Sequence, residues 1–176
     1  MPSLLKAKKD QKRCQKLRKT SISSYEEGMK MALAQAKRAL SKGEVPVGAV
    51  IADADGEIIA KGYNLREASL DPTAHAEMIA IRRAAKRLGT WRLTDCAIFV
   101  TVEPCPMCMG AIIQARIKKV IYGCKDPKAG ACGSVADLSA LKRLNHRVEI
   151  EHGVMEDECS LLLKDFFKKL RHPPKK

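Results

Sequence analysis

Residues 97–108 read AIFVTVEPCPMC, a mostly apolar run followed directly by two prolines and two cysteines. Ala97–Val102 predicts a buried strand, because β-branched and aromatic residues dominate it. Pro104 predicts the opening of a helix that extends to about Ala115, since proline is favoured in the first turn of a helix. A strand that passes directly into a helix is the unit from which parallel sheets are built.

The same alternation extends on both sides of this segment. Asp55-Gly56 lies between two apolar runs and predicts a hairpin turn. Because helices alternate with the other strands, we expect a mostly parallel sheet covered on both faces, an α/β fold of three α/β/α layers with a five-stranded mixed sheet. Apolar spacing and turn residues predict a helix capped by Ser23 or Ser24 and ended by Gly43, strands over 47–52, 58–63, 120–124 and 148–151, and helices over 74–88, 135–142 (a short one) and 156–170.

The two ends of the chain are strongly basic. Residues 1–24 carry eight Lys or Arg against one acid, and residues 161–176 carry six against one, so most of the net charge of +13 lies in the ends. Such ends suit a polyanion, because neutralising phosphates releases counterions. A solubilising segment without a partner, or an organelle transit peptide at the N-terminus, is the alternative. We expect a basic arm over residues 1–22, one domain over 23–170, and a basic tail over 171–176.

The cysteines point to a reducing compartment. The chain has seven, an odd number, and it shows neither a secretory signal nor an apolar run long enough to span a membrane. We therefore expect a cytoplasmic protein without a membrane partner, whose cysteines are metal ligands or core residues and not disulfides.

Two short clusters carry the residues of a metal site, HAE at 75–77 and PCPMC at 104–108. Both fall at predicted helix N-termini. Cys105 and Cys108 are three apart and project to the same side of a helix, whose positive end favours the thiolate form that binds zinc. His75 supplies a third ligand. Three ligands leave one tetrahedral position open, which is typical of a catalytic zinc.

Glu77 follows the ligand His75 by two residues, an offset that can turn its carboxylate towards the open position. There it can take a proton from water whose pKa the metal lowers to about 7, and return protons to a ring nitrogen and a departing amine. This pattern predicts hydrolytic deamination, with Glu77 as the catalytic residue. The alternatives are a closed structural zinc site or an ordinary metal-free core cluster. A closed site would take its fourth ligand from Cys124, Cys132 or His146, but it has no use for a glutamate at this offset.

The H-x-E and P-C-x-x-C pattern is that of zinc-dependent nucleobase deaminases. From residue 25 to about residue 170 the chain also resembles one branch of them, the bacterial tRNA-specific adenosine deaminases, whose fold is cytidine deaminase-like. The chain departs from that family in its longer basic arm and in Cys124, where a small residue is common. The segments that carry the resemblance are EVPVGAV (44–50), Asn64, DPTAHAE (71–77), VEPC (102–105), DPKAG (126–130), NHRVE (145–149) and DFF (165–167).

The resemblance implies an activity and a set of contacts. Members of the family convert the wobble adenosine of a tRNA anticodon to inosine, with one zinc ion per subunit, as homodimers. By matching position, Asn64 would hydrogen-bond the flipped nucleotide and the Ala76 backbone would help to recognise the base. Glu44, Val47 and Asp126 would line the groove for the anticodon stem-loop. Phe166 and Phe167 would pack beside the neighbouring nucleotides, with Phe167 as the contact.

Without the resemblance, several of these residues have plainer interpretations. Asn64 is by default a turn residue and Asp126 a loop acid. A Phe pair in a last helix usually belongs to the core. Likewise, the strip formed by Arg82, Arg83, Lys86 and Arg87 is by default a solvated helix face.

Two other functions remain open on the residues alone. The same zinc chemistry would serve a deaminase of a free base or nucleoside, such as guanine or cytosine, and spacing cannot choose between C4 of cytosine and C6 of adenine. The choice of adenosine rests on the resemblance. A zinc-stabilised RNA-binding scaffold without activity is the third hypothesis, and Glu77 argues against it because a scaffold needs no proton carrier.

Overall fold

The computed structural model describes residues 22–171. The predicted arm (1–22) and tail (171–176) therefore lie outside the described residues, except for Ile22 and Arg171. The elements, in chain order, are α2 (Tyr25–Leu40), β1 (Gly48–Ala52), β2 (Ile58–Tyr63), α3 (Arg66–Ser69), α4 (Ala76–Leu88), β3 (Ala97–Val102), α5 (Pro106–Gln114), β4 (Lys119–Cys124), β5 (Glu149–His152) and α6 (Glu156–Arg171).

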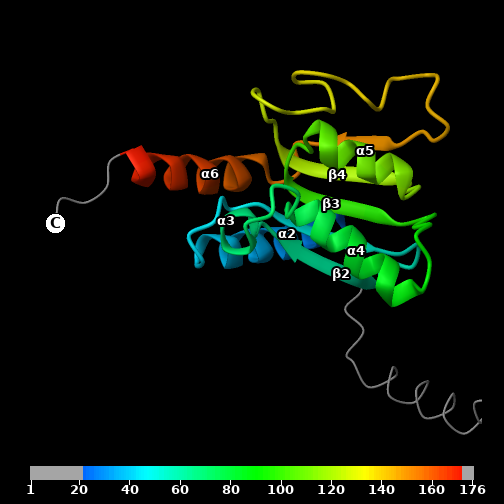
Figure 1. Ribbon diagram of the computed structural model, residues 1–176, viewed down its shortest axis with the longest axis horizontal. Helices are drawn as coiled ribbons and strands as arrows, with labels where there is room; N and C mark the ends of the chain where they lie inside the picture. Colours follow the sequence, from blue (N-terminus) through cyan, green and yellow to red (C-terminus); the bar gives the residue numbers. More distant parts are fainter. Residues whose placement is uncertain (1–21, 172–176) are drawn as a thin grey trace, which may run out of the picture.

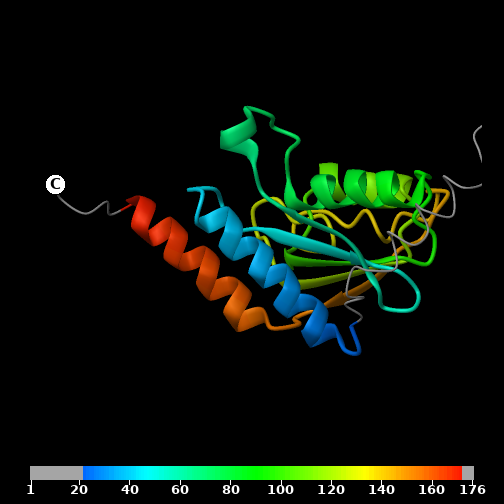
Figure 2. The same cartoon turned by 90° about the horizontal axis from the view of Figure 1, so that it is seen from below.

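The described chain forms three layers around a five-stranded sheet with the order β2-β1-β3-β4-β5. Helices α4 and α5 cover one face, and α2 and α6 lie side by side on the other (Figures 1 and 2). The core between the sheet and helices α2 and α6 includes Met29, Phe99 and Ile121, and the core on the α4 and α5 face includes Ala80 and Ile112. The predicted α/β/α sandwich is confirmed.

The sheet is less parallel than the alternation of elements suggested. Strand β1 pairs antiparallel with both β2 and β3, whereas β3–β4 and β4–β5 are parallel. The predicted turn at Asp55-Gly56 joins β1 to β2, and Gly56 has a φ of +77° there. Because β1 runs against its neighbours, its first residues lie at the same edge of the sheet as the last residues of β2, β3 and β4. That edge carries the candidate site.

The short helix predicted over residues 135–142 is absent, and the segment forms turns. Its backbone donors are used elsewhere: the amides of Val135 and Ala136 donate to the carbonyl of Gly130, and the amide of Leu138 donates to Ala131. A side-chain oxygen of Asp137 accepts the hydroxyl of Ser139 and the amide of Ala140, local bonds that compete with a helix.

Part of the arginine strip on α4 is not simply solvated. Arg83 donates to the carbonyl of Lys61 at 2.7 Å, and Arg87 donates to that of Ile58 at 3.0 Å. These carbonyls belong to β2, an edge strand. Strand edges with free carbonyls invite pairing with other chains, so the two arginines cover the edge and attach α4 to it.

None of the helices in the described part of the chain is long and apolar enough to cross a membrane.

Gly62 sets the close approach of β2 and α4. A Cβ at this position would lie 2.2 Å from the carbonyl oxygen of Ala76 and 2.8 Å from the amide nitrogen of Ala80. We expect Gly62→Ala to displace the start of α4 and to lower the free energy of unfolding by about 1–3 kcal/mol, measured by denaturant titration. Gly110→Ala is the control, because a Cβ at Gly110 meets nothing within 4 Å. Equal stability of the two variants would contradict the close packing.

Candidate active site

Two helix N-termini meet at this edge of the sheet. His75 is the N-cap of α4 and Cys105 is the N-cap of α5, both with extended backbone. Pro106, not Pro104, is the first residue of α5. Because Cys105 is the cap and Cys108 lies in the first turn, both cysteines are at the positive end of the helix, which stabilises thiolates.

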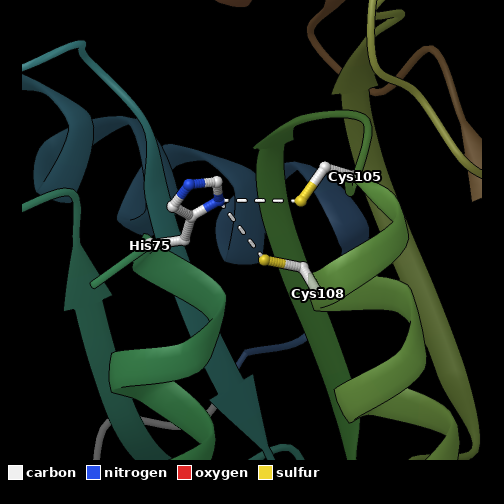
Figure 3. A group of neighbouring side chains, drawn as sticks. All are labelled: His75, Cys105 and Cys108. Carbon is white, nitrogen blue, oxygen red and sulfur yellow. Dashed lines mark hydrogen bonds between the residues drawn. The ribbon is translucent and has the colours of Figure 1, made fainter. Parts of the chain in front are cut away.

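The three predicted ligands point at one another (Figure 3). His75 Nδ1 lies 3.7 Å from Cys105 Sγ and 3.5 Å from Cys108 Sγ, and all three ligand atoms lie within 4.8 Å of one another. Usual zinc–sulfur and zinc–nitrogen bond lengths with a tetrahedral angle place N and S about 3.6 Å apart. The two nitrogen–sulfur distances therefore fit three corners of a tetrahedral metal site. Within residues 22–171 no fourth His, Cys, Asp or Glu joins the group, which favours an open site over a closed structural one.

The pKa values of the two thiols shift in opposite directions. The Cys108 thiol hydrogen-bonds to the sulfur of Cys105, and this bond, with a further contribution from His75, lowers the pKa of Cys105 to about 4 despite its burial. The same bond raises the pKa of Cys108. The lowered pKa of Cys105 favours its thiolate, the form that a metal binds.

Glu77 lies beside the triad and is 3% exposed. Its Oε2 is, among the described residues, the one buried side-chain oxygen or nitrogen without a hydrogen-bond partner. Burial raises the pKa of its carboxyl. Buried polar groups are almost always paired, so an unpaired carboxyl oxygen beside three potential metal ligands marks Glu77 as a candidate functional residue.

A cavity of about 250 Å³ opens over the triad and Glu77. It brings together residues from six different segments of the chain. Five of the six predicted substrate contacts line it: Val47, Asn64, Ala76, Asp126 and Phe167.

Known proteins match this chain in both sequence and fold. The MafB19-like deaminase family matches residues 23–171. The tRNA-specific adenosine deaminase of Bacillus subtilis is 49% identical over 147 residues, which is 84% of this chain and 91% of that protein. The chain belongs to the tRNA-specific adenosine deaminase family.

Two solved structures extend the comparison. One comes from studies of A-to-I editing by tRNA:A34 deaminases at the wobble position of transfer RNA; it is 39% identical, has a TM-score of 0.75, and the match covers 78% of this chain and 99% of that one. The other is the guanine deaminase of Bacillus subtilis, 47% identical with a TM-score of 0.55, where the match covers 58% of this chain and 65% of that one.

The position of Glu44 in this deaminase differs from the prediction. Glu44 is 1% exposed and does not line the cavity. Its carboxylate accepts a hydrogen bond from the side-chain amide of Asn64 at 3.1 Å, and further bonds from the backbone amides of Glu67 and Ala68. Glu44 therefore orients Asn64 and holds α3, instead of facing a groove.

The Phe pair of this deaminase divides between two roles. Phe166 is 8% exposed and belongs to the core, whereas Phe167 is 44% exposed and lines the cavity. Adjacent residues on a helix point about 100° apart, so a pair at the rim of a domain can serve both roles.

Two further charged residues lie at the deaminase cavity and had no predicted role. Arg66 is exposed at its rim, and its only sequence signal is a cation two residues after Asn64. Glu103 is 3% exposed, in the quoted segment before Cys105. Burial raises the pKa of Glu103, but hydrogen bonds from residues 126–134 outweigh it and hold the pKa below its usual range.

Proposed function

We propose that this protein hydrolyses the wobble adenosine of a tRNA anticodon to inosine, through a single deaminase domain over residues 23–170. The observation that carries the proposal is the unpaired Glu77 oxygen in a cavity beside three converging metal ligands. The choice of substrate is supported by the 49% identity to a tRNA-specific adenosine deaminase over 91% of that relative's length.

We propose that His75, Cys105 and Cys108 hold one zinc ion per subunit. When bound there, zinc supplies a Lewis acid that acidifies water at its open position. The soft thiolates and the imidazole favour zinc over magnesium or calcium, which prefer oxygen ligands.

Glu77 moves the protons in this proposal. Its Oε2 takes a proton from the attacking water and delivers it to the N1 nitrogen of the adenine. The C6–O bond forms, the C6–N6 bond then breaks, and Glu77 transfers the second proton of the water to the departing amine. Adenosine and one water thus yield inosine and ammonia, with no oxidant or reductant.

The cavity residues would hold the flipped base. Asn64, fixed by Glu44, and the backbone of Ala76 would recognise it, while Val47, Asp126 and Phe167 would form the walls. A second hollow of about 790 Å³ adjoins the cavity along α6. It carries four cations that suit the flanking phosphates of an anticodon stem-loop: Lys125, Lys128, Lys164 and Arg171.

The family resemblance also implies a homodimer. Light scattering on the purified protein tests it, with twice the monomer mass of 19.4 kDa as the expected result.

The direct test is inosine formation in an anticodon stem-loop with a wobble adenosine. We expect inosine from the zinc-loaded protein and none from its Glu77→Ala variant. If the folded, zinc-loaded protein makes no inosine, tRNA adenosine is the wrong substrate.

A deaminase of free guanine is the second candidate, favoured by the 47% identity to a guanine deaminase over part of the chain. Free cytosine, or a nucleoside of either base, belongs to the same class. Ammonia release from these compounds without activity on RNA would establish it. An inactive RNA-binding scaffold would instead keep its cellular role in the Glu77→Ala variant.

The basic arm is expected to add affinity for RNA. Residues 1–22 carry eight Lys or Arg and one acid, so their removal reduces the number of counterions that binding can release. We expect the chain lacking residues 1–22 to bind tRNA more weakly, with a flatter dependence of log K on log salt concentration, measured by fluorescence anisotropy. An unchanged slope would make the arm a solubilising segment only.

A further inference from the structure

We propose that Glu103 is a positioning residue for the substrate, which fixes one wall of the cavity by holding residues 126–134 against the end of β3. This inference rests on the proposed function and adds to it. Glu103 itself coordinates nothing and transfers no proton in the proposed reaction.

The carboxylate of Glu103 binds both ends of this segment, which we call the wall loop (residues 126–134). Its Oε2 accepts the backbone amide of Asp126 at 3.1 Å and the hydroxyl of Ser134. Its Oε1 accepts the backbone amides of Cys132 at 2.9 Å and Ser134 at 3.1 Å. One buried side chain therefore satisfies three backbone donors and one hydroxyl of a loop that forms neither helix nor strand.

The fit between Glu103 and the wall loop is close. A Cβ at Gly130 would lie 2.3 Å from Cδ of Glu103, so any larger residue at position 130 would displace the carboxylate. This explains the glycine that ends the DPKAG segment. The backbone adds one further bond, from the amide of Ala131 to the carbonyl of Pro104 at 2.9 Å.

Asp126 links Glu103 to the cavity, because it hydrogen-bonds to Glu103 and also lines the cavity. Oδ1 of Asp126 accepts the backbone amides of Lys128 and Ala129, so the turn from 126 to 129 moves as one unit. Asp126 and Ala129 both line the cavity, as does Asn64. Because Glu103 binds the amide of Asp126 itself, it sets how far this wall stands from the base.

The test is steady-state kinetics of Glu103→Gln on the anticodon stem-loop. Glutamine keeps the volume but replaces one acceptor oxygen by a donor NH₂, so at least one amide of the wall loop loses its partner. An unsatisfied buried donor typically changes an equilibrium constant by about one order of magnitude. We therefore expect KM to rise about tenfold. We expect kcat to change less than about twofold and zinc content to stay equal, because the ligands and Glu77 are untouched.

A double-mutant cycle with Asp126→Ala separates positioning from general stability. Asp126→Ala keeps the backbone amide that Glu103 binds and removes only the side chain. If Glu103 acts by placing the Asp126 side chain, the double variant has the KM of the Asp126→Ala variant alone. Additive effects of the two substitutions on KM would overturn the inference, and so would an unchanged KM in Glu103→Gln. A decrease in kcat and zinc content alone, without a change in KM, would also overturn it. If Glu103→Gln does not fold, Ser134→Ala replaces it, and we expect KM to rise about threefold because a single hydrogen bond is lost. Inosine formation by the unaltered protein is measured first. A negative result for Glu103 can then be distinguished from a failure of the proposed function.

Discussion

The Glu77→Gln protein is expected to bind its metal normally and to form inosine about 10²–10⁴-fold more slowly. Glutamine occupies the same volume in the same buried position, so folding and metal binding persist. It cannot accept a proton, however, and both proton transfers in the proposed reaction depend on the Glu77 carboxylate. Single-turnover inosine formation with excess enzyme measures the chemical step directly.

The control for this change is Glu67→Gln, which removes an exposed carboxylate from α3 without touching the cavity. Zinc content and the melting temperature should be the same in both variants and in the unaltered protein. A Glu77→Gln rate within about tenfold of normal would show that another group carries the proton.

Cys108→Ala is expected to abolish activity through loss of the metal. Cys108 is fully buried, and its Sγ faces His75 Nδ1 at 3.5 Å, so no neighbouring side chain replaces it. Because metal binding contributes to folding free energy, the variant should also lose the stabilisation that zinc provides, about 4 kcal/mol at a zinc concentration 1,000 times Kd. Atomic absorption and thermal unfolding measure the two effects.

Cys132→Ala is the matched control for the loss of a cysteine. The Sγ of Cys132 contacts the sulfur of Met109 at 3.6 Å and lies outside the triad, so this variant should keep its zinc. Treatment of the unaltered protein with a chelator should reproduce the Cys108→Ala loss, and added zinc should reverse it. Stoichiometric zinc in Cys108→Ala would refute its assignment as a ligand.

The predictions that hold best depend on short-range rules. The turn at Asp55-Gly56 follows from backbone preferences of two residues, and the convergence of Cys105 and Cys108 follows from helical spacing. Placement of His75 beside them required only that two helix N-termini meet at one sheet edge. Such an arrangement is common in α/β folds, where strand ends form the ligand site.

The features that were missed depend on hydrogen bonds and strand pairings that the periodicity of the sequence does not show. Val135 and Leu141 have apolar spacing that suits a helix, but both are exposed, and the backbone near them bonds to Gly130, Ala131 and Glu103. No local sequence pattern indicates that Glu44 binds the side chain of Asn64, which lies twenty residues away. The antiparallel pairing of β1 with β3 likewise depends on which strands become neighbours, a choice made by the whole sheet.

The two ends of the described chain lie near opposite ends of the strands of the sheet. The amide of Ile22 donates to the carbonyl of Gly56 at 2.9 Å, and the six residues of β2, about 20 Å of strand, separate that turn from Asn64. Arg171, by contrast, ends α6 in the hollow beside the cavity. A second protein fused ahead of Ile22 would therefore be tethered behind the reaction centre and leave its entrance clear. The same protein fused after Arg171 would lie close to the entrance of the cavity and obstruct the binding of nucleic acid.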